Sequence, residues 1–317
     1  MRAVVLTARF LFSANYLKVC YNKPYKTKTE DIMDYSQILS QQFNIKEEYA
    51  KNIITLLDDG NTIPFIARYR KEMHGSMDDQ LIREFAEKLE YLRGLDKRRD
   101  EIRSLIDAQE KLTDEINLAL DKAATLSELE DIYRPYRPKR KTRASIAKEK
   151  GLEPLANDIL KQEKGFDPSK SAVDYIDEEK GVTSVEDAIQ GAMDIIAELV
   201  SDNAEIRKRI RNLTNANGVL VSVATDEEKD SVYKNYYDYK EPVKKIAGHR
   251  VLAVNRGEKE GFLKVSVETD SEKPLNSIFR AMITDKNQLC SDIIREACTD
   301  AYQRLIYPSI EREVRND

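Results

Sequence analysis

The sequence predicts a mainly α-helical protein, an elongated multi-helix scaffold with a small β element near residues 218–225 and 262–269. Three observations predict this class. Charged residues make up 34% of the 317 residues and hydrophobic ones 41%, with only 11 glycines and 9 prolines, a composition typical of helix-rich proteins. Apolar residues recur at helical spacing along most of the chain. Strand-like runs occur only late in the sequence.

The helical pattern begins near Asn44, in "NIKEEYAKNIITLLDDG". Gly60 is expected to end this first helix, and Pro64 interrupts the pattern after it. A capping box of Ser76 and Asp79 is predicted to open the next helix. The residues expected on the apolar face of the first helix are Tyr49, Ile53, Ile54, Leu56 and Leu57.

A long intermittent apolar stripe follows, over about 35 residues, well above the mean helix length of about 11–12 residues. It predicts either one elongated helix or a helical hairpin interrupted near Gly94. The stripe consists of Leu81, Phe85, Leu89, Leu92, Leu95, Ile102, Leu105 and Ile106.

Shorter elements are expected further along. Thr113 is a candidate helix cap, and Ser127 with Glu130 forms a second capping-box pattern. Two runs, "GVLVSVAT" from Gly218 and "FLKVSVET" from Phe262, are candidate strands that could pair with each other. Helices are expected over residues 153–164, 185–200, 203–213 and 289–306.

The last of these helices is expected to turn one apolar face inward. That face is predicted to hold Leu289, Ile293, Ile294, Ala297, Ala301 and Leu305. Cys290 and Cys298 lie eight residues apart in the same pattern, so both are expected to pack in a core. With Cys20 they are the three cysteines of the chain, which is too few for a disulfide framework and favours a reducing, cytoplasmic compartment.

Motifs for catalysis, cofactors and metals are absent from the sequence. His74 and His249 are the only histidines, and neither has a second ligand at metal-binding spacing. The glycine-rich phosphate loops and the G-x-S-x-G elbow do not occur. No run of 18 apolar residues exists, so a membrane span is not expected. We therefore expect a protein that is not an enzyme and carries no cofactor or metal.

One stretch is strongly basic within a chain of net charge −5. "YRPYRPKRKTR" predicts a polyproline II rail, because Pro135 and Pro138 favour extended neighbours. Arginines at every third position would then line one edge of it. Two interpretations stay open: a grip on nucleic acid, or a surface that docks on acidic helices of the same chain. The candidate nucleic-acid-binding residues here are Arg134, Tyr136, Arg137, Lys139, Arg140, Lys141 and Arg143.

A second basic cluster, "RYRK", follows "TIPFIA" and adds Arg68, Arg70 and Lys71 to the candidates. These side chains could contact nucleic acid, or they could extend from a buried turn with their charged ends in water.

Read together, several stretches resemble the Tex family of bacterial transcription accessory proteins, from about Asp34 to the end of the chain. The carrying motifs are "TIPFIARYRKE" (62–72), "LEYLRGLDKRRDEI" (89–102), "LEDIYRPYRPKRKTRASIAKEKGLEPLA" (129–156) and "YDYKEPVKKIAGHRVLAVNRGEKEGFLKVSV" (237–267). The resemblance implies a helical scaffold with a helix-turn-helix-like part that associates with RNA or DNA without sequence specificity. It further implies a role in transcription, with protein docking on the transcription machinery as the alternative.

The same resemblance suggests how the chain is organised. Residues 34–214 are expected to form the N-terminal helical domain, and residues 215–317 a central region with the β element. Residues 1–33 are expected to be a disordered leader or an artefact of the gene model. The RNase-H-like YqgF, helix-hairpin-helix and OB-fold RNA-binding domains of the family are not found in the sequence, so we expect a truncated member.

Overall fold

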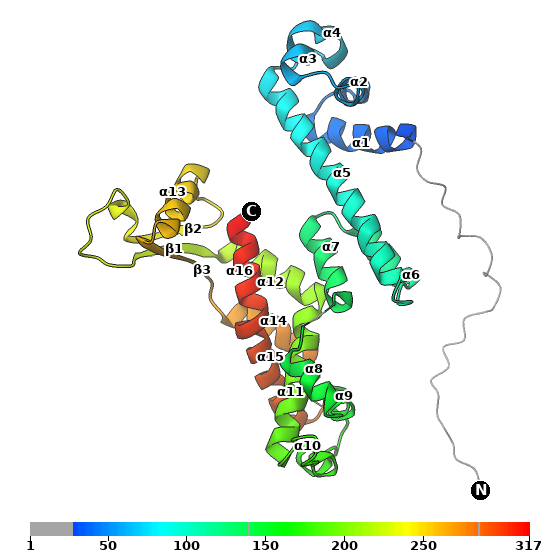
Figure 1. The fold of residues 1–317 in the computed structure, drawn as a ribbon, viewed down its shortest axis with the longest axis vertical. Helices are drawn as coiled ribbons and strands as arrows, with labels where there is room; N and C mark the ends of the chain where they lie inside the picture. The colour runs from blue at the N-terminus through cyan, green and yellow to red at the C-terminus, as the bar shows by residue number, and fades with distance from the viewer. Residues whose placement is uncertain (1–27, 139, 285) are drawn as a thin grey trace, which may run out of the picture. The chain divides into compact units, whose positions relative to one another are not determined.

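The computed structural model describes residues 28–138, 140–284 and 286–317, with side chains from Tyr35 onward. Lys139, Cys20 and most of the predicted leader lie outside the described residues. The chain is mainly α-helical with one small antiparallel sheet, which confirms the predicted class (Figure 1). It divides into two compact units, unit 1 up to Asp100 and unit 2 from Glu101. The domain boundary expected near residue 214 stays a prediction.

The described part of unit 1, from Lys28, consists of four helices and the first part of a fifth. These are α1 (Lys28–Phe43), α2 (Glu47–Asp58), α3 (Ile63–Tyr69), α4 (Lys71–His74) and the beginning of α5 (Asp79–Asp107). Helix α2 is the first predicted helix, and Pro64 lies in the first turn of α3, where its missing N–H costs nothing. The fully buried side chains of unit 1 include Leu39, Ile53, Ile54, Ile66, Ile82 and Phe85.

Helix α5 is a single helix of 29 residues that runs through Gly94 without interruption. The hairpin alternative was therefore wrong. The predicted cap was wrong as well, because Asp78 accepts the hydrogen bond from the Leu81 amide at 2.8 Å. Ser76 has a φ of +65° and belongs to the left-handed turn after α4, whereas a helix cap needs an extended backbone.

Unit 2 begins with the last part of α5. The elements that follow are α6 (Asp114–Lys122), α7 (Leu126–Tyr133), a 3₁₀ turn η1 (Arg134–Tyr136) and α8 (Arg143–Glu149). Thr113 caps α6 as predicted, since its side chain accepts from the Ile116 amide. The cap of α7 is Thr125 and not Ser127, so that helix begins earlier than the predicted capping box placed it. The next helices are α9 (Glu153–Lys161), α10 (Pro168–Ala172), the 3₁₀ turn η2 (Val173–Tyr175), α11 (Val185–Asp202) and α12 (Ala204–Asn217).

The last helices of unit 2 are α14 (Glu272–Met282), α15 (Gln288–Asp300), a π-helical segment η4 (Ala301–Ile306) and α16 (Tyr307–Asn316). Helix α11 packs against α8, α9, α15 and η4 in the main core. Cys290 and Cys298 are fully buried there, as predicted. Leu289 is 54% exposed, contrary to the prediction, because the inward face of α15 carries Cys290, Ile294 and Ala297 instead.

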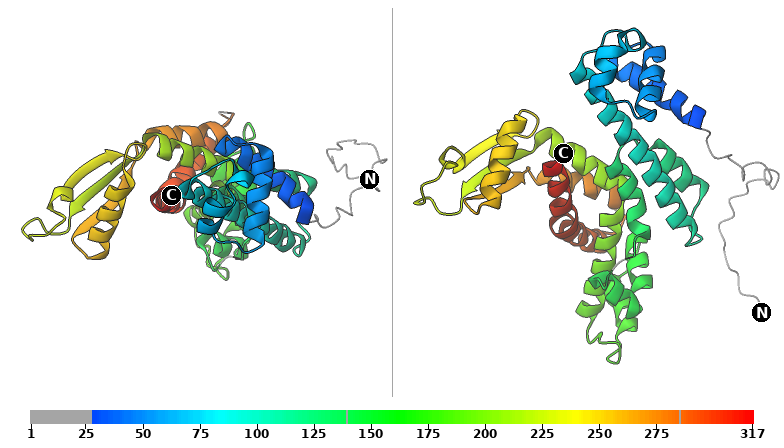
Figure 2. Two further views of the ribbon diagram at one scale, coloured as in Figure 1. Left: turned by 90° about the horizontal axis from the view of Figure 1, so that it is seen from above. Right: turned by 45° about the horizontal axis from the view of Figure 1, so that its top comes forward.

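The sheet has the strand order β2-β1-β3, with β1 (Val219–Ala224), β2 (Asp238–Pro242) and β3 (Leu263–Glu268). The predicted pair, β1 and β3, is antiparallel. Strand β2 was missed because "DYKEP" has no β-branched residue and only one aromatic residue, Tyr239, which packs on the sheet core. Helix α13 (Gly248–Lys259) lies along the sheet (Figure 2). Strand β3 is tied to α16, because the Tyr307 hydroxyl donates to the Val267 carbonyl and Glu311 accepts from the Val267 amide at 3.0 Å.

Candidate nucleic-acid interface

The basic segment, residues Arg134–Arg143, does not form the predicted polyproline rail. Arg134 is helical, with φ −51° and ψ −44°, because the chain leaves α7 through the 3₁₀ turn η1. Pro135 fits the start of that turn, because proline has no backbone N–H and a residue at this position needs no hydrogen-bond donor. Arg137 is extended, with φ −67° and ψ 132°, as expected before Pro138. Arg143 begins α8, so the predicted line of four arginines on one edge is wrong.

Two of these arginines face acidic residues of unit 2. The Arg134 Nε donates to the Asp202 carboxylate at 3.3 Å, and the side chain is about one-third exposed. Burial lowers the pKa of Arg134, and the positive charge of Arg207 lowers it further. Arg137 pairs with Glu130, and its guanidinium lies 5.6 Å from the centre of the Tyr133 ring. At these two positions the segment docks on the protein's own helices.

The remaining cations of the basic segment that the structure describes point into solvent. Arg140 and Arg143 are exposed and form no ion pair with a described residue. Lys141 lies 3.6 Å from Glu149, but both side chains are about two-thirds exposed, and such a pair is worth little. Tyr136 is half-buried, and its carbonyl accepts from Gln109 at 2.9 Å. Burial raises the pKa of the Asp194 carboxyl of α11, and the positive charge of Arg143 acts against that rise. The exposed side chains of Arg140, Lys141 and Arg143 are accessible to a ligand.

A capping box holds the end of the basic segment. The Thr142 side chain accepts from the Ser145 amide at 3.0 Å, and the Ser145 hydroxyl accepts from the Thr142 amide at 2.8 Å. The Thr142 hydroxyl also donates to Glu198 of α11 at 3.0 Å. These bonds fix the start of α8 at Arg143, the last residue of the basic segment.

Beneath the segment lies a buried ionic network that the sequence did not reveal. Asp131 of α7 accepts from Arg207 and Arg211 of α12, the latter at 2.6 Å. Both arginines also bind Glu313 of α16, each at 2.7 Å. Arg207 is fully buried. The network joins three helices that are distant in sequence. Asp131, an acid among the apolar residues of "LEDIY", is the only feature of the sequence that indicates it.

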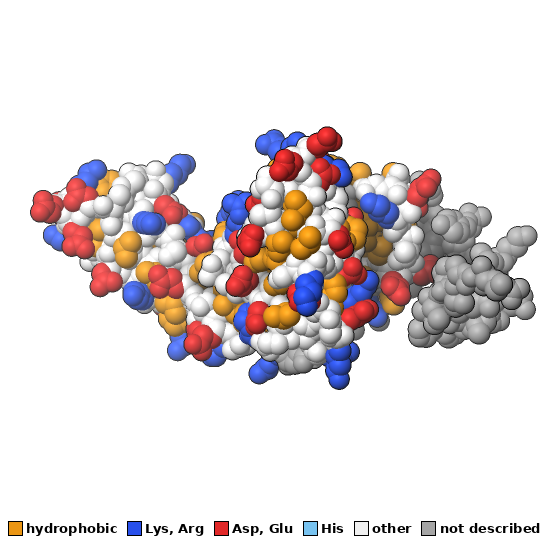
Figure 3. Space-filling model, turned by 90° about the horizontal axis from the view of Figure 1, so that it is seen from below, with side chains coloured by type: hydrophobic (Ala, Val, Ile, Leu, Met, Phe, Trp, Pro, Cys, Tyr) orange, Lys and Arg blue, Asp and Glu red, His pale blue; other side chains and the backbone are white. Residues whose placement is uncertain are grey.

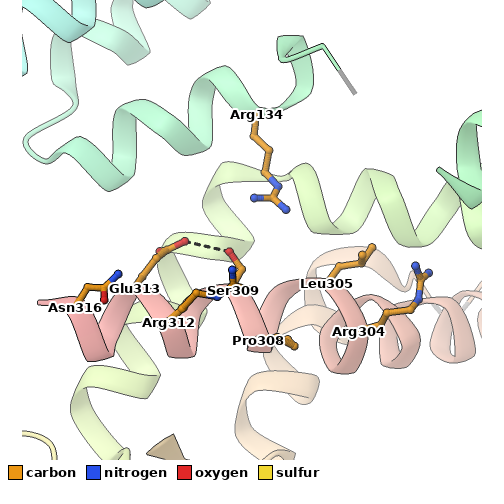
Figure 4. Close-up of a pocket in the computed structure, with 8 residues that line it drawn as sticks. All are labelled: Arg134, Arg304, Leu305, Pro308, Ser309, Arg312, Glu313 and Asn316. Carbon is orange, nitrogen blue, oxygen red and sulfur yellow. Dashed lines mark hydrogen bonds between the residues drawn. The ribbon is translucent and has the colours of Figure 1, made fainter. Parts of the chain in front are cut away.

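A pocket of about 370 Å³ opens beside α16 and is drawn in Figure 4. Arg134 reaches toward α16 from the α7 side, while Glu313 and Ser309 are hydrogen bonded along its floor. Arg304 is bound to Asp300, whereas the exposed Arg312 forms no ion pair with a described residue. The lining residues are Arg134, Arg304, Leu305, Pro308, Ser309, Arg312, Glu313 and Asn316.

The sequence did not predict Arg304 and Arg312 as site residues. They come near Arg134 because α7 and α16 both pack against α12, and no motif around them signals it.

The second cluster lies in unit 1, at the junction of α3 and α4. Arg68 and Lys71 are exposed, and Arg70 is half-buried with its guanidinium 5.1 Å from the centre of the Phe65 ring. None of the three forms an ion pair with a described residue. Tyr69 between them is 64% exposed. The structure thus brings aromatic and cationic side chains together here, where the sequence showed only that they are close along the chain.

The side of the protein shown in Figure 3 does not carry one broad basic field. There, lysine and arginine side chains alternate with acidic ones among the drawn residues. Among the described His, Cys, Asp and Glu side chains, no group of three or more could hold a metal ion. No helix in the described ranges is long and apolar enough to cross a membrane.

The fold and the site define a mainly helical scaffold with small groups of exposed arginines. Comparison with known proteins identifies its family. Residues 33–107 match the family model of the Tex-like protein N-terminal domain, and residues 163–317 match that of the Tex central region. The chain belongs to the Tex family.

Three relatives show the extent of the similarity. Protein YdcI of Bacillus subtilis is 43% identical over 292 residues, which is 90% of this chain and 41% of the relative. Transcriptional accessory protein Tex of Neisseria gonorrhoeae is 39% identical over 238 residues, 74% of this chain and 31% of the relative. The human S1 RNA-binding domain-containing protein 1 is 30% identical over 308 residues, 92% of this chain and 30% of the relative. The chain spans about two-fifths or less of each of these proteins.

Proposed function

We propose that this chain is a nucleic-acid-associated transcription accessory protein that contributes by binding and not by catalysis. The Tex protein of Neisseria gonorrhoeae is named for transcription, and the human relative is named for an RNA-binding domain. The observation that carries the proposal for this chain is the exposure of Arg140 and Arg143, which form no ion pair with a described residue.

The physical argument concerns phosphate groups. An arginine without a carboxylate partner can donate two parallel hydrogen bonds to a phosphate. Phosphate contacts give affinity without reading the base sequence, so binding to RNA or DNA would be non-specific. Arg134 and Arg137 do not take this role, because their guanidinium groups already face Asp202 and Glu130. They instead hold the segment in place.

The first prediction is that the double variant Arg140→Gln/Arg143→Gln weakens binding to a labelled oligonucleotide. For each phosphate that is no longer bound, the slope of log affinity against log salt should also fall by about 0.7–0.9. Fluorescence anisotropy over a salt series measures both quantities. Because we propose binding without catalysis, the chain should not cleave the oligonucleotide, which should be recovered intact after incubation.

The matched control is Lys164→Gln/Lys273→Gln, which removes the same charge from exposed lysines elsewhere in unit 2 that form no ion pair with a described residue. The control should change the oligonucleotide affinity and the salt slope less than Arg140→Gln/Arg143→Gln does. Equal effects of the two double variants would contradict specific contact by the basic segment. A lower melting temperature with unchanged binding would instead favour internal docking of these arginines.

A further inference from the structure

We propose that the α3 patch, formed by Phe65, Arg68, Tyr69, Arg70 and Lys71, binds unpaired bases of a single-stranded nucleic acid by stacking on Tyr69. This inference rests on the proposed function and adds a second site, in unit 1, with a different mode of contact. It starts from the side chains that the structure brings together around the end of α3.

The patch combines aromatic rings with a guanidinium plane. The Phe65 and Tyr69 rings are 5.4 Å apart at an interplanar angle of 43°. The Arg70 guanidinium lies 5.1 Å from the centre of the Phe65 ring, and its Nη1 donates to the Tyr69 carbonyl at 3.1 Å. Tyr69 leaves 64% of its surface in water. An exposed ring beside arginine suits base stacking, which accepts every base because each has a π face.

The base of the patch is held in place from inside unit 1. Ile66, between the two rings in sequence, is fully buried. The buried His74 Nε2 lies 3.1 Å from the Ile66 carbonyl, and Asn52 donates to the Met73 carbonyl at 3.0 Å. These contacts fix the turn between α3 and α4. A ring presented from a fixed turn loses little entropy when a ligand binds.

The charge around the patch favours a polyanion. Arg68, Arg70 and Lys71 form no ion pairs with described residues, and Glu72 is the only acid between Gly60 and Asp78. Phosphates that flank a stacked base would therefore meet positive charge on a surface that is otherwise mixed.

Another aromatic–cation pair of unit 1 has acidic residues around it. Lys88 Nζ lies 4.7 Å from the centre of the Tyr91 ring, and Tyr91 is 41% exposed. Glu84 and Glu87 line the same shallow pocket, so phosphates would be repelled there. Tyr91 is thus a control for Tyr69, because both are exposed tyrosines of unit 1 near a cation, and the surrounding charge differs.

The geometry favours single strands over duplexes. A base can stack on Tyr69 only if its face is free, and duplex bases are already stacked on each other. An acidic peptide could pair with the cations of the patch, but it would not need the exposed ring. Removal of the ring without removal of charge therefore separates these ligands.

The test measures binding of a labelled oligothymidine of about 15 nucleotides, within the range that single-strand sites cover. Tyr69→Ala should weaken binding roughly tenfold without changing the salt slope, because no charge is removed. Tyr69→Phe should bind like the unchanged chain, since it keeps the ring. Tyr91→Ala should also bind like the unchanged chain, and Tyr69→Ala should leave affinity for a duplex unchanged.

The outcomes separate the two proposals. If the chain binds oligothymidine but Tyr69→Ala has no more effect than Tyr91→Ala, the stacking site is overturned and the proposed function stands. If Tyr69→Ala weakens single-strand and duplex binding equally, stacking on free bases is also overturned. If the unchanged chain binds neither single strand nor duplex, both proposals fail together. Circular dichroism of each variant confirms that unit 1 remains folded.

Discussion

At the scale of single residues, the basic segment depends on a buried acid. Asp131 is 4% exposed and accepts from both Arg207 and Arg211. Glu313 of α16 binds the same two arginines. Two buried guanidinium groups are thus balanced by two carboxylates. Burial of a charge is costly unless it is paired and hydrogen bonded, so each member of this network is needed by the others. Arg134, which begins the basic segment, lies three residues from Asp131.

We predict that Asp131→Asn lowers the free energy of unfolding by about 3–5 kcal/mol, because it leaves two buried arginines to share Glu313 alone. Urea unfolding followed by circular dichroism measures the change. Glu149→Gln is the control, since it removes an exposed partner of Lys141 and should cost less than about 1 kcal/mol. A similar small change for both variants would show that the network contributes little.

At the scale of the elements, the helices on either side and the prolines between them shape the basic segment. Helix α7 continues into η1 and turns Arg134 inward, Pro138 keeps Arg137 extended, and the cap of α8 ends the segment. The segment is therefore a connection between α7 and α8. Some of its cations pair with acidic residues of unit 2, and the others are exposed to solvent. Local hydrogen bonds, and not a repeating backbone geometry, determine which arginine belongs to which group.

The cap of α8 gives an element-scale prediction. Thr142→Ala removes the bond to the Ser145 amide and the bond to Glu198, and should destabilise unit 2 by about 1 kcal/mol, within the range of helix caps. Thr142→Ser keeps a hydroxyl at the cap and should retain most of that stability. Thermal unfolding of both variants measures the difference, and an equal loss in the two would argue against the cap.

At the scale of the whole chain, two units each bury a core of their own. The boundary between Asp100 and Glu101 falls inside α5, so one helix belongs to both. The core of unit 2 contains Cys290 and Cys298. Burial raises the pKa of both thiols, that of Cys298 to about 12. The two thiols thus report on whether the core of unit 2 is intact.

In a Cys20→Ser background we predict that neither thiol reacts with iodoacetamide near neutral pH until the core unfolds, because only the thiolate reacts. A thiol whose pKa is raised by folding favours the folded state below its unfolded pKa. That contribution is lost as the pH rises toward about 12. Mass spectrometry of labelled protein across urea concentrations measures the reaction. Rapid labelling of the folded chain would contradict the burial of these thiols.

The sequence by itself determined the helical class, the apolar stripe of α5, the strands β1 and β3 and the burial of the two cysteines. Each depends on periodicity or composition along a continuous stretch. It also identified the family through its motifs. It left open whether the stripe forms one helix or a hairpin, and the structure shows one helix. The sequence could not assign partners to charges, because a cation in a basic run looks the same whether its acid is in the next turn or far along the chain.

Only the tertiary structure decided which cations are docked and which face outward. Arg134 pairs with Asp202 and Arg137 with Glu130, while Arg140 and Arg143 are left exposed. Helix α16 brings Arg312 to the pocket that Arg134 also lines. In unit 1 the turn after α3 places Tyr69 beside Phe65 and Arg70. The physical reason is common to both units: ion pairs and ring contacts depend on distances of a few ångströms, which packing sets and sequence order does not.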